Sequence, residues 1–250
     1  MKIIIFLFML FVSLHNVYAS EIEVVFGVSR PPFIMEKQKT GISYELFKCI
    51  ANKMGMNFYP VFASNTRMEV MMQKGNFDII VEVQKTVSNL FYSSPFIAYR
   101  NFAVTKGKEA FQFRDYADLR GKSVCSWQNA QDNLGKSFRS QIPKFKKYKE
   151  FPLQEKQVLS WMLGNFEVII IDDTLLKWWI KKLEPKLVKY GEKVDLNNIQ
   201  YHPLPGGNTL WWHVVFKDKI LRDRFNTVLE KMKKNGEYNR IREGFVNQYK

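Results

Sequence analysis

A regular alternation of strand and helix patterns over residues 22–83 is the feature that most constrains the fold. Short apolar runs typical of strands cover 22–28, 57–62 and 77–83, and the third is apolar enough to be buried on both faces of a sheet. Between them, residues 41–55 and 66–74 carry apolar side chains three and four positions apart, the spacing of a helix. This order predicts a parallel sheet with crossover helices.

Glycines and small polar residues mark the ends of these two helices. Gly55 and Gly75 follow the helical patterns, where a C-terminal glycine is favoured. Thr66 or Asn65 is suited to cap the start of the second helix.

The same alternation returns in the second half of the chain. Its predicted strands are 101–105, 123–126, 168–171 and 210–216, and its predicted helices are 130–140, 153–163, 174–183 and 218–234. Neither a short-period repeat nor a low-complexity linker interrupts the pattern. We therefore expect two α/β lobes without a flexible tether.

The first residues have the pattern of an export signal. Lys2 is followed by an unbroken apolar run over 3–12, and Val17-Tyr18-Ala19 then supplies the small and apolar residues that precede cleavage. We expect a signal peptide over 1–19 and a free periplasmic protein after it, without a lipid anchor, because no Cys stands near the cleavage region.

The alternative for this segment is an uncleaved membrane anchor. Such a helix needs about 20 apolar residues to cross a bilayer. Here Ser13, His15 and Asn16 interrupt the run too early.

Composition narrows the classes of function. Apolar residues make up 46% of the chain and aromatic residues 15%, enough for a packed core. The net charge of +14 is common in nucleic-acid-binding proteins, but an exported protein rarely meets nucleic acid, so we expect a solvated basic surface instead. Only His202 and His213 follow the signal, without HExxH or CxxC patterns, and we predict neither a metal site nor a cofactor.

Seven short segments stand out in the mature chain. They are 31–33 (PPF), 41–46 (GISYEL), 75–80 (GNFDII), 92–96 (YSSPF), 118–124 (DLRGKSV), 164–172 (GNFEVIIID) and 232–241 (MKKNGEYNRI). Together and in this order, they resemble the bacterial extracellular solute-binding proteins of family 3, the polar amino-acid-binding receptors of ABC transporters. The similarity runs over about residues 22–249.

The resemblance implies a two-lobed α/β fold of the type II periplasmic-binding-protein class. The chain would cross between the lobes twice at a hinge, with a small polar solute clamped in the cleft. Lobe one would span 20–99 plus 211–250, and lobe two 100–210. Cys49 and Cys125 then fall in different lobes, so we predict that they do not pair, although an oxidising compartment permits disulfides. We expect a monomer that serves an inner-membrane ABC permease.

Two residues match positions that bind ligand in the family. Phe33 stands where an aromatic ring packs on the ligand; the alternative is a core phenylalanine. Asp172 matches the acidic residue that takes the ligand's amino group. Its alternative role is the N-cap of the helix that begins near Thr174, unless Asp173 supplies that cap.

The chain departs from the family at the carboxylate-binding position. After the third strand, the family has an Arg that grips the α-carboxylate of the ligand, and this segment has none. Lys85 or Arg100 could substitute. Asn129 stands in place of the family's Gly-Thr turn in lobe two, and Ser43 stands where Asp is usual.

Glu82 adds an acid at a position where small polar residues are usual. It either faces the cleft or lies at a solvent-facing strand end. If it faces the cleft, Glu82 and Asp172 together would suit a ligand with a cationic end.

The tryptophans divide into two groups. Trp127, Trp211 and Trp212 lie at predicted lobe edges and are candidates for the cleft wall. Trp161, Trp178 and Trp179 fit helix packing better.

Three functions remain open. The first is a transport receptor for ABC-type uptake. The second is an enzyme on the same fold, similar to periplasmic cyclohexadienyl dehydratases, with Glu82 or Asp172 as the general acid. The third is an orphan sensory binding protein. We favour binding without catalysis.

Overall fold

The structure, a computed structural model, describes residues 21–28, 30–107, 111–189, 191, 198–207 and 209–247. The predicted signal peptide, 1–19, lies outside these residues. Within the described residues, no helix is both long and apolar enough to span a bilayer.

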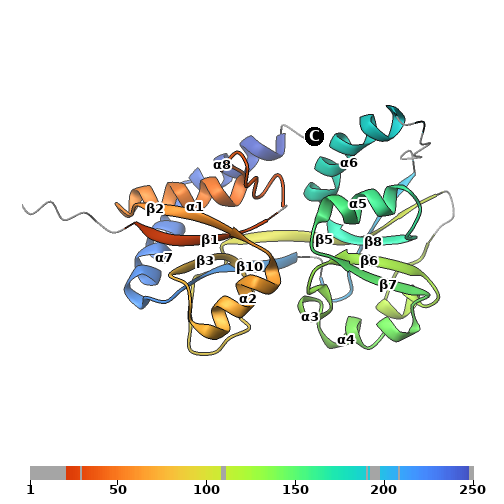
Figure 1. The fold of residues 1–250 in the computed structure, drawn as a ribbon, viewed down its shortest axis with the longest axis horizontal. Helices are drawn as coiled ribbons and strands as arrows, with labels where there is room; N and C mark the ends of the chain where they lie inside the picture. Colours follow the sequence, from red (N-terminus) through yellow and green to blue (C-terminus); the bar gives the residue numbers. More distant parts are fainter. Residues whose placement is uncertain are drawn as a thin grey trace, which may run out of the picture.

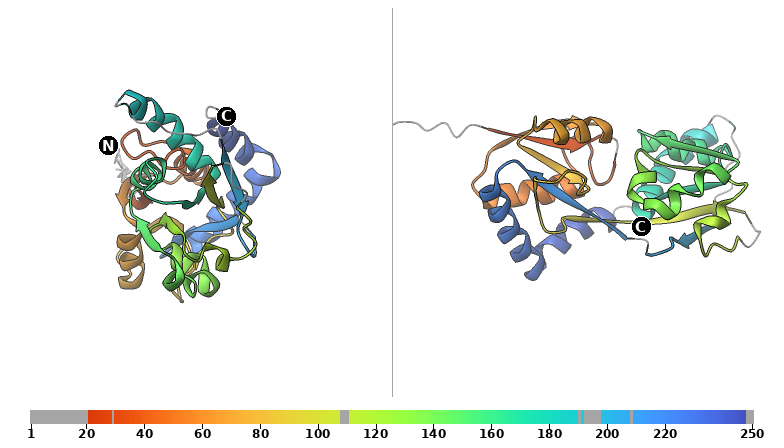
Figure 2. Two further views of the ribbon diagram at one scale, coloured as in Figure 1. Left: turned by 90° about the vertical axis from the view of Figure 1, so that its right-hand side faces the viewer. Right: turned by 90° about the horizontal axis from the view of Figure 1, so that it is seen from below.

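The described chain forms two α/β lobes that lie side by side (Figures 1 and 2). Two long strands, β5 (Ile97–Lys106) and β10 (Thr209–Phe216), run from one lobe into the other. Residues 209–212 of β10 pair with the start of β5, and residues 213–216 pair with β3 (Ile79–Val83). The chain therefore crosses between lobes twice, as the resemblance implied, and the cleft lies beside these two strands.

Lobe one contains the N-terminal strands. Its strands run in the order β2-β1-β3-β10, with β1 parallel to both neighbours and β10 antiparallel to β3. Besides β3 and β10, its elements are β1 (Ile22–Gly27), β2 (Phe58–Ala63), β4 (Phe91–Tyr92), α1 (Ile42–Lys53), α2 (Asn65–Lys74), α7 (Lys219–Lys234) and α8 (Glu237–Val246). The parallel pairing predicted for 22–83 is confirmed.

Helices cover both faces of the lobe-one sheet because successive strand residues point to opposite faces. Val24 and Phe26 of β1 belong to the core cluster that includes α1, α7 and α8. Val25, between them, belongs to the cluster that includes Met68 and Met72 of α2. Figure 1 shows α1 and α2 on opposite sides of these strands.

Lobe two has the same construction. Its strands run in the order β9-β5-β8-β6-β7, with β6 parallel to β7 and β8. Besides β5, its elements are β6 (Ser123–Trp127), β7 (Lys147–Phe151), β8 (Val168–Asp172), β9 (Ile199–Pro203), α3 (Ala130–Asn133), α4 (Gly135–Arg139), α5 (Gln154–Met162), α6 (Asp173–Lys189) and two short 3-10 turns, Tyr116–Leu119 and Ile142–Lys144. The central strand β8 is buried along its whole length.

Two local predictions are wrong. The helix predicted over 130–140 is split into α3 and α4, because Gly135 has a φ of 81°, outside the right-handed helical region. The cap of α2 is Ser64, one residue before the predicted positions, and its hydroxyl accepts a hydrogen bond from the backbone N–H of Arg67 at 3.4 Å.

Both cysteines are free thiols. Cys49 lies on α1 in lobe one, and Cys125 is buried in β6 of lobe two. The prediction that they do not pair is confirmed.

Candidate functional site

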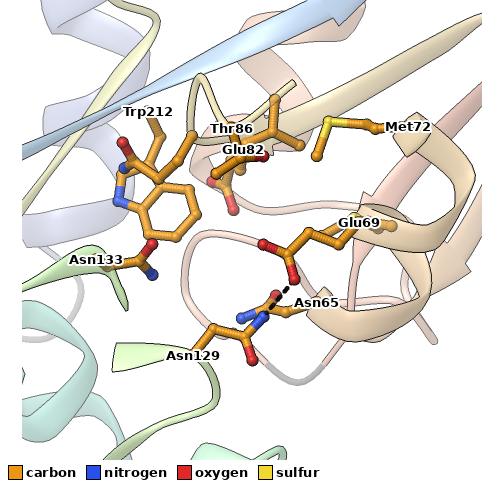
Figure 3. Close-up of a pocket in the computed structure, with 11 residues that line it drawn as sticks. Asn65, Glu69, Met72, Glu82, Thr86, Asn129, Asn133 and Trp212 are labelled. Atoms are coloured by element: carbon orange, nitrogen blue, oxygen red, sulfur yellow. Dashed lines mark hydrogen bonds between the residues drawn. The ribbon is translucent and has the colours of Figure 1, made fainter. Parts of the chain in front are cut away.

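Two adjoining pockets lie in the cleft. The first, which we call the acidic pocket, has an empty volume of about 330 Å³ and contains Glu69 and Glu82 as its charged lining residues (Figure 3). The second, which we call the indole pocket, has an empty volume of about 340 Å³ and contains Arg30 as its charged lining residue. Asn65 and Trp212 line both pockets.

The remaining lining residues differ in character between the two pockets. The acidic pocket is completed by Met68, Met72, Val83, Gln84, Thr86, Asn129 and Asn133. The indole pocket is completed by Tyr99, Asn101, Trp127, Gln154 and Leu175. Residues of lobe one and lobe two contribute to both walls, so each pocket depends on the arrangement of the two lobes.

A buried ion pair lies at the floor of the cleft. Arg30 Nη1 donates to Glu82 Oε2 at 2.7 Å, and the two side chains are 8% and 0% exposed. The other Glu82 oxygen accepts from the hydroxyl of Ser43, and Arg30 Nη2 donates to Asn65 Oδ1. Each charge is therefore compensated by an opposite charge and by a neutral hydrogen-bond partner, which buried charges require.

Local backbone geometry places both members of this pair. Arg30 stands in the loop after β1, where a side-chain carbon on Gly27 would lie 2.5 Å from the Arg30 guanidinium carbon, so glycine leaves room for it. Glu82 has a φ of 63°, and the register of β3 against β10 shifts between His213 and Val214. This bulge turns the Glu82 side chain into the cleft, and such strained positions are often found at functional sites.

Two hydrogen bonds cross the cleft from one lobe to the other. Asn65 Nδ2, in lobe one, donates to the backbone oxygen of Gln128 in lobe two at 3.2 Å. Asn129 Nδ2, in lobe two, donates to Glu69 Oε2 of α2 at 3.0 Å (Figure 3). Three of the four residues that these bonds join, Asn65, Glu69 and Asn129, line the acidic pocket, so their side chains serve both the contact between the lobes and the binding wall.

The Asn129 turn is held by a carboxylate beneath it. Asn129 has a φ of 67°, and the backbone N–H groups of Asn129 and Gln131 donate to the two oxygens of Glu150 at 2.8 and 2.9 Å. Across the cleft, partial burial raises the pKa of Glu69, and the nearby Asp132 carboxylate raises it further. Asn129 thus presents its amide to a partly buried acid.

Asp172 is buried at the end of β8, but its oxygens are engaged within the protein. Oδ1 accepts from the backbone N–H groups of Thr174 and Leu175 at 2.9 and 3.1 Å, and Oδ2 accepts from that of Arg100 at 2.6 Å. This is the N-cap pattern of α6, the alternative role considered for it. Burial, and secondarily the Asp173 charge, raises the pKa of Asp172 to about 7.

Phe33 and Ser43 lie beneath the pockets rather than in their walls. Phe33 is 1% exposed, and its ring packs on that of Tyr99 with 4.2 Å between the centroids. Tyr99 in turn lines the indole pocket, and its pKa lies well above the usual range, chiefly because the hydroxyl is buried. Ser43 is fully buried and supports Glu82.

The two cations proposed to replace the family's arginine lie elsewhere. Lys85 is exposed and belongs to neither pocket lining. Arg100 has a side chain that is 58% exposed and forms an ion pair with Asp173. The cation that the structure brings into the cleft is Arg30, from the loop after β1.

Sequence reasoning missed Arg30, Asn65 and Glu69 as cleft residues. Arg30 directly precedes Pro31-Pro32-Phe33, so its position beside a ligand-binding segment was an available signal. The sequence gives no comparable signal for Glu69, because an acid on the exposed face of a helix cannot be told apart from any other solvated acid. Of the three tryptophans proposed for the wall, Trp127 and Trp212 line pockets, and Trp211 is 48% exposed and lines neither.

No metal-binding cluster of three or more His, Cys, Asp or Glu side chains occurs among the residues that the structure describes. The polar side-chain groups that line the cleft are amides, indoles, the hydroxyls of Thr86 and Tyr99, one guanidinium and two carboxylates. Such groups are suited to orient a small polar molecule by hydrogen bonds.

Known structures share this fold. The GluR0 ligand-binding core in complex with L-glutamate superposes with a TM-score of 0.71, at 16% identity over 92% of this chain and 99% of that one. ArtJ, the arginine-, lysine-, histidine-binding protein of Geobacillus stearothermophilus, gives 0.68, at 17% identity over 92% and 96%. A histidine kinase sensor domain with similarity to periplasmic binding proteins gives 0.70, at 18% identity over 90% and 96%.

Sequence comparison points the same way. No curated protein matches the chain. The family model described as bacterial extracellular solute-binding proteins, family 3, matches residues 22–248. The two-lobed fold, the double crossing and this match over nearly the whole described chain agree, and the chain belongs to the bacterial extracellular solute-binding proteins of family 3.

Proposed function

We propose that this protein is a periplasmic receptor that clamps a small polar solute between its lobes and delivers it to an ABC permease. The observation that carries the proposal is the pair of hydrogen bonds across the cleft, Asn65 to Gln128 and Asn129 to Glu69. Asn65, Asn129 and Glu69 line the acidic pocket, so the bonds that join the lobes couple closure to the contents of the cleft.

The proposed receptor is exported through the signal peptide 1–19 and works as a monomer without a lipid anchor. Its lobes are 20–99 plus 211–250 and 100–210. These boundaries fall within β5 and β10, where the chain crosses, and a few residues on these strands then form the hinge.

The ligand that suits this cleft carries a cationic group. ArtJ, which shares the fold, is described as a binding protein for arginine, lysine and histidine. Glu82 and Asp172 were the first candidates to receive it, but both oxygens of each accept from protein donors. Glu69 lines the acidic pocket and has one oxygen hydrogen-bonded to Asn129, so it is the better place for the cation.

A thermal-shift screen of the mature protein against amino acids, amines and organic acids tests the proposal. A ligand at 100 times its dissociation constant adds about 2.7 kcal/mol of stability, which gives a clear rise in Tm. Stabilisation by one chemical class supports a receptor. If no solute of any class raises the Tm, the proposed function is wrong.

The similarity to a histidine kinase sensor domain keeps a sensory role as the second candidate. The two roles share the clamp and differ in its partner. Transfer of labelled solute into vesicles that contain a neighbouring permease supports uptake, and binding to a sensor kinase with no such transfer supports sensing.

Catalysis is the least supported role. The pKa of Asp172, about 7, suits a general acid, but its carboxylate caps α6 and lines neither pocket. Incubation with prephenate is the check. Product formation would contradict binding without catalysis.

A further inference from the structure

The indole pocket contains polar atoms that the protein leaves without partners. Among the described residues, four polar groups of its lining are buried and lack a hydrogen-bond partner: the indole N–H groups of Trp127 and Trp212, the Tyr99 hydroxyl and the Gln154 side-chain oxygen. The two tryptophans are 6% and 9% exposed. A buried donor or acceptor without a partner is costly, so these groups point to a ligand that satisfies them.

The chemistry of this pocket favours an acceptor group. Two indole N–H groups donate and cannot accept, and the Arg30 guanidinium adds donors that its bonds to Glu82 and Asn65 do not exhaust. No carboxylate belongs to the described lining of this pocket. A ligand carboxylate would complete these donors and lie beside a positive charge.

The acidic pocket has the opposite character. Its charged lining residues are Glu69 and Glu82, and no Lys or Arg belongs to its described lining. Asn65 and Trp212 line both pockets, so a single solute that passes them would touch both. The cleft thus offers an anion site and a cation site at separate places.

This separation is unfavourable for an α-ammonium group. In an α-amino acid, the ammonium lies one carbon from the carboxylate, so it would enter the indole pocket beside Arg30. The described lining there offers it neutral acceptors, Gln154 Oε1 and the Tyr99 hydroxyl, but no carboxylate. The two acids nearest in the fold, Glu82 and Asp172, already accept protein donors at both oxygens. An ammonium at the far end of a chain would instead reach Glu69.

We propose that the cleft selects an ω-amino carboxylic acid, with the carboxylate held by Arg30, Trp127 and Trp212 and the distant ammonium held by Glu69. This inference rests on the proposed receptor function and names its substrate class. The methylene chain would lie against the Trp212 ring, which borders both pockets and is amphipathic enough to cover it.

Calorimetry on the mature protein with matched probes tests the class. The ω-amino acids are 4-aminobutanoate, 5-aminopentanoate and 6-aminohexanoate; L-lysine adds an α-ammonium to the last, and hexanoate lacks any ammonium. We expect one ω-amino acid to bind at least tenfold more tightly than L-lysine and than hexanoate. Tighter binding of L-lysine, or of hexanoate, overturns the substrate class and leaves the receptor function standing. Binding of no probe overturns the substrate class, and the receptor function fails as well only if the wider solute screen is also negative.

Variants of Trp127 and Glu69 test which residue binds which end of the ligand. Trp127→Phe keeps an aromatic ring, though a smaller one, and removes the N–H, and we expect about fivefold weaker binding of the best ω-amino acid. Trp161→Phe is the matched control, because its buried N–H is also unpartnered but it lines neither pocket. Equal affinities for these two variants would contradict the role of Trp127.

Glu69→Gln separates cation binding from lobe closure, since Glu69 also accepts the cross-lobe bond from Asn129. We expect it to weaken binding of the ω-amino acid at least tenfold and binding of hexanoate much less. An equal loss for both probes would mean that Glu69 serves closure only, and would overturn the cation site.

Discussion

Arg30 and Glu82 meet at the cleft floor although 52 residues separate them in the chain. From the sequence, Glu82 was recognisable as an added acid near the site, but no local pattern indicated its partner. The pair depends on the bulge that turns Glu82 inward and on the space left by Gly27, and both are properties of the folded backbone. Asp172 shows the same limit, because a carboxylate at a strand end is compatible with a ligand contact and with a helix cap.

At this scale, we predict that Arg30→Met destabilises the protein by about 3 kcal/mol or more, because it leaves the Glu82 carboxylate buried without its counter-charge. Urea unfolding measures the loss. The matched control is Lys122→Met, which breaks the exposed pair with Glu167 and is expected to change stability far less. A loss in Arg30→Met no larger than in the control would contradict the account of the buried pair.

Asp172 gives a prediction for pH. Its pKa in the folded protein, about 7, lies above the ordinary value of 3.8, so between these values the folded state keeps a proton that the unfolded state has lost. The contribution of Asp172 to stability is therefore present at low pH, falls as the pH rises from about 4 to about 7, and is constant above that.

Asp172→Asn keeps an oxygen for the helix cap and removes the titration. The free energy of unfolding of the wild type minus that of this variant is expected to fall across the same pH range, as measured by chemical denaturation at several pH values. A difference that is flat with pH, or that rises, would show that Asp172 does not carry the raised pKa.

At the scale of elements, most of the fold was predictable from periodicity. The strands and helices over 22–83 form as predicted, because their apolar faces are regular and their ends carry glycine. The misses have local causes. β7 (KYKEF) is rich in lysine at a sheet edge, and β9 (IQYHP) has few apolar residues. The predicted helix 218–234 ends where α7 does, but α8, a short helix directly after Gly236, was not predicted.

Helix α7 permits a test of these local rules. Asp218 precedes it, and its Oδ1 accepts from the backbone N–H of Leu221 at 2.9 Å. Asp218→Ala is expected to lower the free energy of unfolding by about 1 kcal/mol, and Asp218→Asn, which retains an accepting oxygen, by much less. Equal stabilities for the two variants in urea unfolding would exclude a capping role.

At the scale of the whole molecule, the order of seven short segments predicted the two-lobed fold and the double crossing. The sequence could not indicate how the lobes meet, because Asn65, Glu69, Gln128 and Asn129 are ordinary polar residues until the fold brings them together. Separation of charge between the two pockets likewise arises from packing. Figure 1 shows that α2 and the α3–α4 segment belong to different lobes, which face one another beside the crossing strands.

Closure on a solute is the central claim, and a distance between the lobes tests it most directly. Spin labels on Val70→Cys of α2 and Ser137→Cys of α4, both exposed, with Cys49→Ser and Cys125→Ala to remove native thiols, report that distance by pulsed electron resonance. With the solute that most raises the Tm, we predict that a broad distribution in the free protein narrows and shifts to a shorter distance. A distribution that saturating solute leaves unchanged would contradict the clamp.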